Sequence, residues 1–147
     1  MFLSVDSRET IELARTECIE LLARTHIGRV ALSMPDGTPV IRPVNYVFDQ
    51  ASQSVVFRTA LGSKLHALLH ARQAAFEIDS LDHESQTGWS VILVGLPEPV
   101  TNPAERRRLE SEAVEPWAAG KKPHWVRIRA TVLSGRRIVK AAGAVPQ

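Results

Sequence analysis

The chain has 147 residues, of which 44% are hydrophobic and 23% charged, the composition of an ordinary soluble globular protein. This length is that of one domain with a substantial core. The formal net charge is only +2, and no apolar run reaches the roughly 18 residues that span a bilayer. The first ten residues lack the features of a secretory signal. We therefore expect one cytoplasmic domain over residues 1–147, with loose ends at 1–9 and 140–147 and no membrane partner.

Charge patterning and cysteine content narrow the chemistry further. Basic clusters occur at 106–108, 121–122 and 136–137, but no stacking aromatics or known reading motif accompany them. We therefore expect no nucleic-acid partner. The only cysteine, Cys18, lies in an apolar-rich segment. It predicts a small buried side chain and provides no disulfide framework and no Cys-based metal cluster.

The N-terminal segment allows two interpretations. Asp6 and Glu9 fit a capping box, from which one helix would run to Arg24. In the other interpretation, a short strand over Thr10–Leu13 precedes a helix over Thr16–Ala23. Periodicity alone does not separate the two.

The next segments predict two strands joined by a tight turn. Residues 28–34 alternate apolar with small or polar side chains, and residues 38–48 form a second strand that contains Pro39 and Pro43. Because proline has no N–H to donate to a ladder, this strand should lie at a sheet edge or beside a bulge. Part of its backbone would then remain available to a ligand.

The rest of the chain predicts further short elements separated by turn residues. These are a strand over 54–59, a helix over 63–71, strands over 74–79 and 89–96, a helix over 103–114 that begins at Asn102-Pro103, and strands over 124–133 and 136–139 separated by a turn at Ser134-Gly135. Many short strands with two or three helices favour a mostly β fold, a small barrel, over a parallel α/β sheet.

The segment from Phe57 to Lys64 predicts an anion site at a strand-to-helix corner. Gly62 allows a close backbone approach, and Ser63 and Lys64 open a helix whose N–H groups and dipole favour a negative charge. Arg58 and Thr59 could add a guanidinium and a hydroxyl from the preceding strand. In the competing interpretation, Ser63 only caps the helix, and Lys64 and Arg58 are solvated.

Other chemistries have little support in the sequence. His66 and His70 have the spacing of a helical metal chelate, but further ligands are missing, so we expect no metal. Glu77, Asp79, Asp82 and Glu84 flank a loop and are expected to be solvated. No nucleophile elbow occurs, and Cys18 has no neighbouring histidine. The catalytic residues are therefore unknown.

Taken in order, these segments resemble the FMN-binding split-barrel family typified by pyridoxamine 5′-phosphate oxidases, and most closely its short branch that includes nitroimidazole-resistance proteins. The resemblance covers about residues 16–138. The matching residues are Gly28–Ala31, Arg42–Tyr46 with Phe48-Asp49, Phe57–Thr59, Gly62–Lys64, Ala75–Glu77, Gly88–Val91 with Gly95, and Gly135–Ile138. The same resemblance favours the strand followed by a helix at the N-terminus.

The resemblance implies a homodimer of antiparallel, Greek-key-like split barrels, with an FMN in each of two clefts between the subunits. By similarity, Arg58, Thr59, Gly62, Ser63 and Lys64 hold the phosphate. The ring then lies along the strand formed by Arg42, Pro43, Val44, Asn45 and Tyr46. Trp89 and Ser90 approach the cofactor from an adjacent strand, and Trp125 is a candidate contribution of the partner subunit.

The activity that the resemblance implies is reduction of a small, planar, electron-poor substrate by hydride transfer. Vitamin B6 synthesis is not expected, because the Trp- and Arg-bearing C-terminal segment of true pyridoxamine phosphate oxidases is missing. Relatives from actinobacteria use a deazaflavin coenzyme with the same ribityl phosphate, so a deazaflavin-dependent reductase is an alternative. A non-catalytic cofactor-binding or storage protein is another. Haem binding would require an axial ligand, for which His66, His70 and His124 are the candidates.

Overall fold

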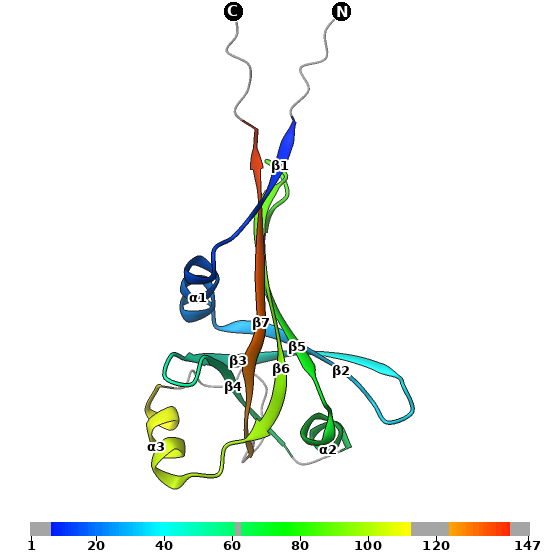
Figure 1. Cartoon of the computed structure of the whole chain (residues 1–147), viewed down its shortest axis with the longest axis vertical. Coiled ribbons are helices and arrows are strands. Elements are labelled where there is room, and N and C mark those ends of the chain that lie inside the picture. The colour runs from blue at the N-terminus through cyan, green and yellow to red at the C-terminus, as the bar shows by residue number, and fades with distance from the viewer. Residues whose placement is uncertain (1–6, 61–62, 113–123, 142–147) are drawn as a thin grey trace, which may run out of the picture.

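The computed structural model describes residues 7–60, 63–112 and 124–141 (Figure 1). The elements are β1 (Arg8–Glu12), α1 (Arg15–Arg24), β2 (Ile27–Ser33), β3 (Pro39–Asp49), β4 (Ser54–Thr59), α2 (Ser63–His70), β5 (Ala74–Asp82), β6 (Thr87–Pro99), α3 (Pro103–Glu112) and β7 (His124–Lys140). At the N-terminus, the short strand followed by a helix is confirmed, and the single long helix is wrong.

The strands form a closed antiparallel barrel. The sheet order is β1-β7-β4-β3-β2-β5-β6, and β6 also pairs with β7, which closes a ring of six strands within the described part of the chain. Two three-stranded meanders, β2-β3-β4 and β5-β6-β7, meet where β2 pairs with β5 and β4 pairs with β7. The mostly β split-barrel fold expected from the sequence is confirmed.

A ribbon of strands extends from this barrel along the long axis of the molecule (Figure 1). It consists of β1, the hairpin between β5 and β6, and the end of β7, where Arg8 pairs with Lys140. The backbone N–H of Ala141 also donates to the carbonyl of Ser7 at 2.9 Å. Arg8, Glu9 and Lys140, which were expected to lie in loose ends, are therefore paired in strands. Residues 1–6 and 142–147 lie outside the described residues.

The turn predicted at Ser134-Gly135 does not form, because β7 continues through it as one strand. Gly135 instead marks a close approach between β7 and the segment that leads into α1. A Cβ atom there would lie 2.7 Å from the Cys18 Sγ, and the Leu13 N–H donates to the Gly135 carbonyl at 2.9 Å. The glycine is a packing residue rather than a turn residue.

The main core fills the barrel and extends under α1. Cys18, Leu21 and Leu22 of α1 are buried against it, as predicted for Cys18. Burial raises the pKa of the Cys18 thiol, and the charge of Glu17 adds to that effect. Cys18 is therefore a structural residue and not an activated nucleophile.

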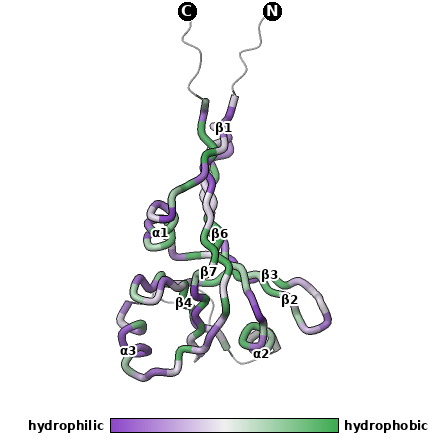
Figure 2. The backbone as a smooth tube through the Cα atoms, in the orientation of Figure 1, coloured by the Kyte–Doolittle hydropathy of each residue, from purple (hydrophilic) through white to green (hydrophobic). Residues whose placement is uncertain are grey.

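A second core lies between the barrel and α3. It consists of Val56, Val100, Leu109 and Trp125, with Val47 packed against it. The Asn102 side chain caps α3 by accepting from the Glu105 N–H at 3.0 Å, as the sequence predicts. The remaining surface of α3 is largely hydrophilic (Figure 2). The predicted end of this helix at Val114 lies outside the described residues.

No helix among residues 7–60, 63–112 and 124–141 is long and apolar enough to cross a membrane.

Candidate cofactor site at the split between two strands

The barrel opens into a fork between β3 and β4. These strands pair only from Tyr46–Phe57 to Asp49–Ser54. On the N-terminal side of Tyr46, β3 pairs with β2 alone among the described strands. On the C-terminal side of Phe57, β4 pairs with β7. The edge of β3 from Pro39 to Asn45 therefore pairs with no described strand on the β4 side. Half of the predicted cofactor residues, Arg42 to Asn45 with Arg58 and Thr59, lie on the two edges of this fork.

Strand geometry determines which backbone groups face the fork. The Tyr46 N–H donates to the His26 carbonyl at 3.0 Å, so Tyr46 directs its backbone groups toward β2. In an antiparallel ladder the direction alternates, so Ile41 and Pro43 direct theirs toward the fork. The missing N–H of Pro43 therefore removes no hydrogen bond between β3 and β2. The predicted edge character of this strand holds for this half of β3, although β3 is not an edge strand of the sheet.

The side chains of β3 from Arg42 to Tyr46 divide between the surface and the core. Arg42 is exposed and donates from Nη1 to the Ile41 carbonyl at 3.0 Å, while Val44 packs against the main core. Asn45 is half-buried where the strands separate. Tyr46 is 2% exposed, and its hydroxyl donates to the Leu22 carbonyl at 2.7 Å. The Tyr46 side chain therefore anchors α1 and does not face the fork, a role that the sequence motif alone does not reveal.

Arg58 lies at the end of β4, on the opposite edge of the fork. Its guanidinium carbon lies 5.2 Å from the centre of the Trp125 ring, and the two residues are direct ladder partners. Trp125 is 3% exposed and belongs to the second core. The Trp125 ring is therefore buried beside Arg58 of its own chain, and its candidate contribution to a partner's cofactor site stays a prediction.

The remaining phosphate residues follow Arg58 along the chain. Thr59 is half-buried at the end of β4, opposite His124, and α2 begins at Ser63. Lys64 stands in the first turn of α2. Gly62 lies outside the described residues, and the roles of the Ser63 and Lys64 side chains stay predictions. Arg58, Thr59 and the start of α2 thus follow one another closely along the chain at the end of β4.

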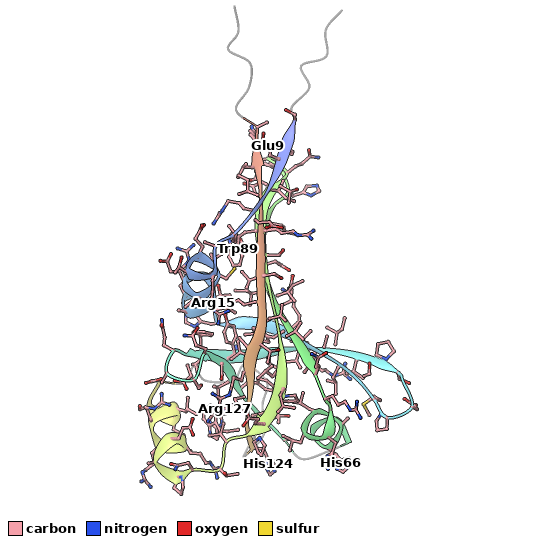
Figure 3. All side chains as sticks on the ribbon, in the orientation of Figure 1. Glu9, Arg15, His66, Trp89, His124 and Arg127 are labelled. Atoms are coloured by element: carbon pink, nitrogen blue, oxygen red, sulfur yellow. The ribbon has the colours of Figure 1, made fainter. Side chains whose placement is uncertain are left out.

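Trp89 and Ser90 lie far from this corner within one chain. Trp89 pairs with Arg137, whereas Arg58 pairs with Trp125 at the opposite end of β7. The ten residue steps of β6 from Trp89 to Pro99 correspond to roughly 30 Å of strand. Figure 3 shows Trp89 well separated from His124 along the long axis. Trp89 and Ser90 line a cavity of about 250 Å³ on the ribbon, together with Gly88, Arg136 and Ile138 among others.

Of the histidines considered for metal or haem, His66 and His70 lie on α2 and His124 begins β7. The His66 and His70 rings stack with centroids 4.1 Å apart, and the His70 Nδ1 lies 2.8 Å from the His66 carbonyl oxygen. Within the described ranges, no group of three or more His, Cys, Asp or Glu side chains could hold a metal ion.

The carboxylates expected to be solvated have two different roles. Asp82 caps the hairpin turn, with its Oδ1 accepting from the N–H groups of Glu84 and Ser85. Glu77 and Asp79 share the Arg29 guanidinium at 3.4 and 3.3 Å on the outer face of the barrel. Burial, reinforced by Asp79, raises the pKa of Glu77 to about 7 against the opposing effect of Arg29. The sequence showed these residues but not their shared arginine, because Arg29 is on another strand.

Comparisons with known proteins agree with this architecture. The family model described as pyridoxamine 5′-phosphate oxidase matches residues 14–137. The uncharacterized protein Rv0080 of Mycobacterium tuberculosis is 33% identical over 138 residues, which cover 90% of this chain and 88% of that protein.

Solved structures with a similar fold include an FAD-binding protein from Mycobacterium smegmatis, which is 33% identical with a TM-score of 0.66 and covers 88% of this chain and 98% of its own. An FAD-binding protein from Mesorhizobium loti has a TM-score of 0.71 at 20% identity, covers 87% of this chain and 97% of its own, and supports the fold alone. The split barrel, the ordered motifs along it and these matches lead to one conclusion: this chain belongs to the pyridoxamine 5′-phosphate oxidase family.

Proposed function

We propose that this protein is an oxidoreductase that binds a flavin-type cofactor, FMN, in the fork between β3 and β4. The observation that carries the proposal is that Arg58, Thr59 and the start of α2 follow one another at the end of β4, across the fork from a β3 edge that pairs with no described strand. A guanidinium, a hydroxyl and a helix N-terminus are donors suited to a phosphate. The open edge offers the Pro43 carbonyl and the backbone of Ile41 to the polar edge of a planar ring.

The comparisons support a flavin in particular. The M. smegmatis protein that is 33% identical over nearly its whole length is described as FAD-binding. A deazaflavin coenzyme is the alternative cofactor, because it has the same ribityl phosphate and the corner recognises only that group.

We further propose that two copies of the chain form each cofactor site. The outer face of the barrel has an apolar row across β3, β2, β5, β6 and β7, formed by the ladder partners Ile41, Ala31, Ala75, Val94 and Val132. Ile41 is 64% exposed and Val132 is 55% exposed. A contiguous apolar row on an outer face is suited to burial against a second copy. Because Trp89 and Ser90 lie far from the fork of their own chain, their predicted cofactor contact would be made from the partner.

The proposed reaction is reduction of a small, planar, electron-poor substrate. The bound cofactor supplies the hydride chemistry. The chain anchors the phosphate at the corner, aligns the ring along β3 and excludes water from one side of it. The fork edges, residues 39–45 and 58–59, have no carboxylate, imidazole or thiol. That observation favours the second candidate, a protein that binds or stores the cofactor without turnover.

The first experiment identifies the cofactor. The purified protein is denatured and any released chromophore is identified by mass spectrometry, and the apo-protein is then titrated with FMN, a deazaflavin coenzyme and haem. We expect a ribityl-phosphate cofactor to bind. If none binds, or if haem alone does, the proposal is wrong.

The second experiment tests the corner. Charge-assisted hydrogen bonds contribute about 1.5–3 kcal/mol each, so Arg58→Ala combined with Lys64→Ala should weaken FMN binding by about 100-fold or more. Arg24→Ala, at the exposed end of α1, is the matched control and should leave the affinity unchanged. An unchanged affinity in the double variant would show that the phosphate lies elsewhere.

The third experiment separates a reductase from a binding protein. The holoprotein is reduced and mixed in a stopped-flow instrument with a series of planar, electron-poor acceptors. A reductase loses its reduced-cofactor signal faster with an acceptor than with oxygen alone. A binding protein shows no such acceleration.

A further inference from the structure

Trp125 is held rigidly at the start of β7. It is 3% exposed and packs with Val56, Val100 and Leu109 in the second core. Its carbonyl accepts from the Val100 N–H at 2.9 Å, which ties it to the segment that precedes α3. The ring therefore has little freedom to move.

The cover over this ring is also fixed. Leu109 is the fully buried residue of α3, and ion pairs attach this helix to the barrel. Arg127 pairs with Glu105, and Arg108 pairs with Asp49 at 3.0 Å. Arg127 lies near the base of the molecule, in the same region as His124 (Figure 3). These contacts place a rigid aromatic surface directly beside the end of β4.

Arg58 rests on that surface. Its guanidinium carbon lies 5.2 Å from the centre of the Trp125 ring, within the range of a cation–π interaction. A long arginine side chain has many rotamers, and immobilising one when a ligand binds opposes binding. Contact with the ring restrains the guanidinium before any ligand arrives. Because the attraction is to the face of a ring, it uses none of the N–H donors that recognise an anion.

We infer that Trp125 is a positioning residue that holds the Arg58 guanidinium in place for the cofactor phosphate. The inference rests on the proposed function, and it gives the buried tryptophan a role in affinity for the phosphate as well as in packing. A tryptophan that only fills the second core would affect every ligand of the fork equally.

The test compares FMN with riboflavin, which has the same ring and ribityl chain but no phosphate. The ratio of the riboflavin Kd to the FMN Kd isolates the contribution of the phosphate. Arg58→Ala should lower this ratio by about 10-fold or more. Trp125→Leu should lower it by several-fold while changing the riboflavin Kd little. The double variant should then have the same ratio as Arg58→Ala alone, because Trp125 affects the phosphate only through Arg58.

Two variants keep the test decisive. Trp125→Phe retains a weaker aromatic surface and should lower the ratio less than Trp125→Leu does; it carries the test if the leucine variant does not fold. Leu21→Ala removes a fully buried side chain from the separate main core, under α1, and should leave the ratio unchanged.

A wild-type ratio in both Trp125 variants, or additive losses in the double variant, would overturn the positioning role. A ratio near 1 in the wild type would instead overturn the phosphate corner itself, and the positioning role with it. The two failures are therefore distinguishable.

Discussion

At the scale of single residues, Gly28 shows how closely this barrel is packed. A Cβ atom at Gly28 would lie 2.1 Å from the Cζ of Phe76, which is fully buried. The Phe76 ring in turn packs edge-on against Tyr46, with centroids 4.7 Å apart. The ring has no open space on the Tyr46 side into which it could retreat. The glycine in β2 is therefore required by the aromatic residue on β5.

Gly28→Ala should lower the free energy of unfolding by about 1–3 kcal/mol, because it overpacks the barrel. Urea denaturation measures the change. Adding Phe76→Leu to Gly28→Ala should recover part of the lost free energy of unfolding, because leucine lacks the ring atoms that the alanine Cβ would meet. Ser33→Ala, exposed on the same strand, is the control and should have little effect. Additive losses for Gly28→Ala and Phe76→Leu would contradict the packing argument.

Glu77 provides a pH-dependent test at the same scale. Burial and the neighbouring Asp79 raise its pKa from 4.5 to about 7, although Arg29 opposes them. The folded state therefore binds this proton more tightly than the unfolded state does. The stability that the proton contributes is fully present below pH 4.5 and is lost as the pH rises through about 7.

The free energy of unfolding of Glu77→Gln relative to the wild type should therefore be higher at pH 8 than at pH 5. Urea denaturation at both pH values measures this difference. Asp79→Asn removes one cause of the raised pKa, so in that background the pH dependence attributable to Glu77 should be smaller. An equal effect of Glu77→Gln at both pH values would contradict the raised pKa.

At the scale of elements, Asp49 is one of the barrel residues that hold α3 in place. This carboxylate is 4% exposed; it accepts from the Ser52 hydroxyl at 2.5 Å and from Arg108 Nη1 at 3.0 Å. Burial alone would raise the pKa of Asp49, but the hydrogen bonds from Ser52 and Arg108 outweigh it and lower the pKa. The ionised form is thus the one that fastens α3 over the second core.

Asp49→Asn should lower the free energy of unfolding by about 1.5–3 kcal/mol at pH 7, since it removes a charge-assisted pair. A lowered carboxyl pKa contributes stability above the unfolded value of 3.8, which is lost as the pH falls through the folded value. The difference between wild type and variant should therefore shrink below about pH 4. Denaturation at a series of falling pH values measures it, and a difference that does not shrink at any acidic pH would exclude this role for the ionised form.

At the scale of the whole molecule, the proposed dimer depends on the outer face of the barrel. The apolar row from Ile41 to Val132 runs across five strands, and the charged cluster of Arg29, Glu77 and Asp79 lies beside it. An exposed valine replaced by glutamate costs a monomer little, but it places an unpaired charge in a buried interface.

Val132→Glu should therefore convert the proposed dimer to a monomer. Light scattering coupled to size-exclusion chromatography measures the mass. Ile41→Glu, at the other end of the row, should act in the same way, whereas Arg107→Glu on the exposed surface of α3 should leave the dimer intact. A wild-type protein with the mass of one chain, or variants that remain dimeric, would refute association through this face.

Much of the architecture could be predicted from the sequence, because the signals involved are local. Alternating side chains predicted the strands, the Asn102-Pro103 pair predicted the start of α3, and Pro39 and Pro43 predicted a strand with an open edge. The segment from Phe57 to Lys64 likewise predicted the strand-to-helix corner that the structure forms. The turn predicted at Ser134-Gly135 was wrong, because a glycine that permits a close approach has the same local sequence pattern as one that permits a turn.

Tertiary structure alone decided which of these residues meet. The fork exists because β3 and β4 pair for only a few residues before each continues with a different partner. Trp125 lies against Arg58, and Trp89 far from it, because β7 joins β4 at one end and the ribbon at the other. Pairing between strands distant in the chain depends on the packing of the whole barrel, and local patterns do not record it. The sequence by itself therefore determined the kind of corner, and the barrel decided what surrounds it.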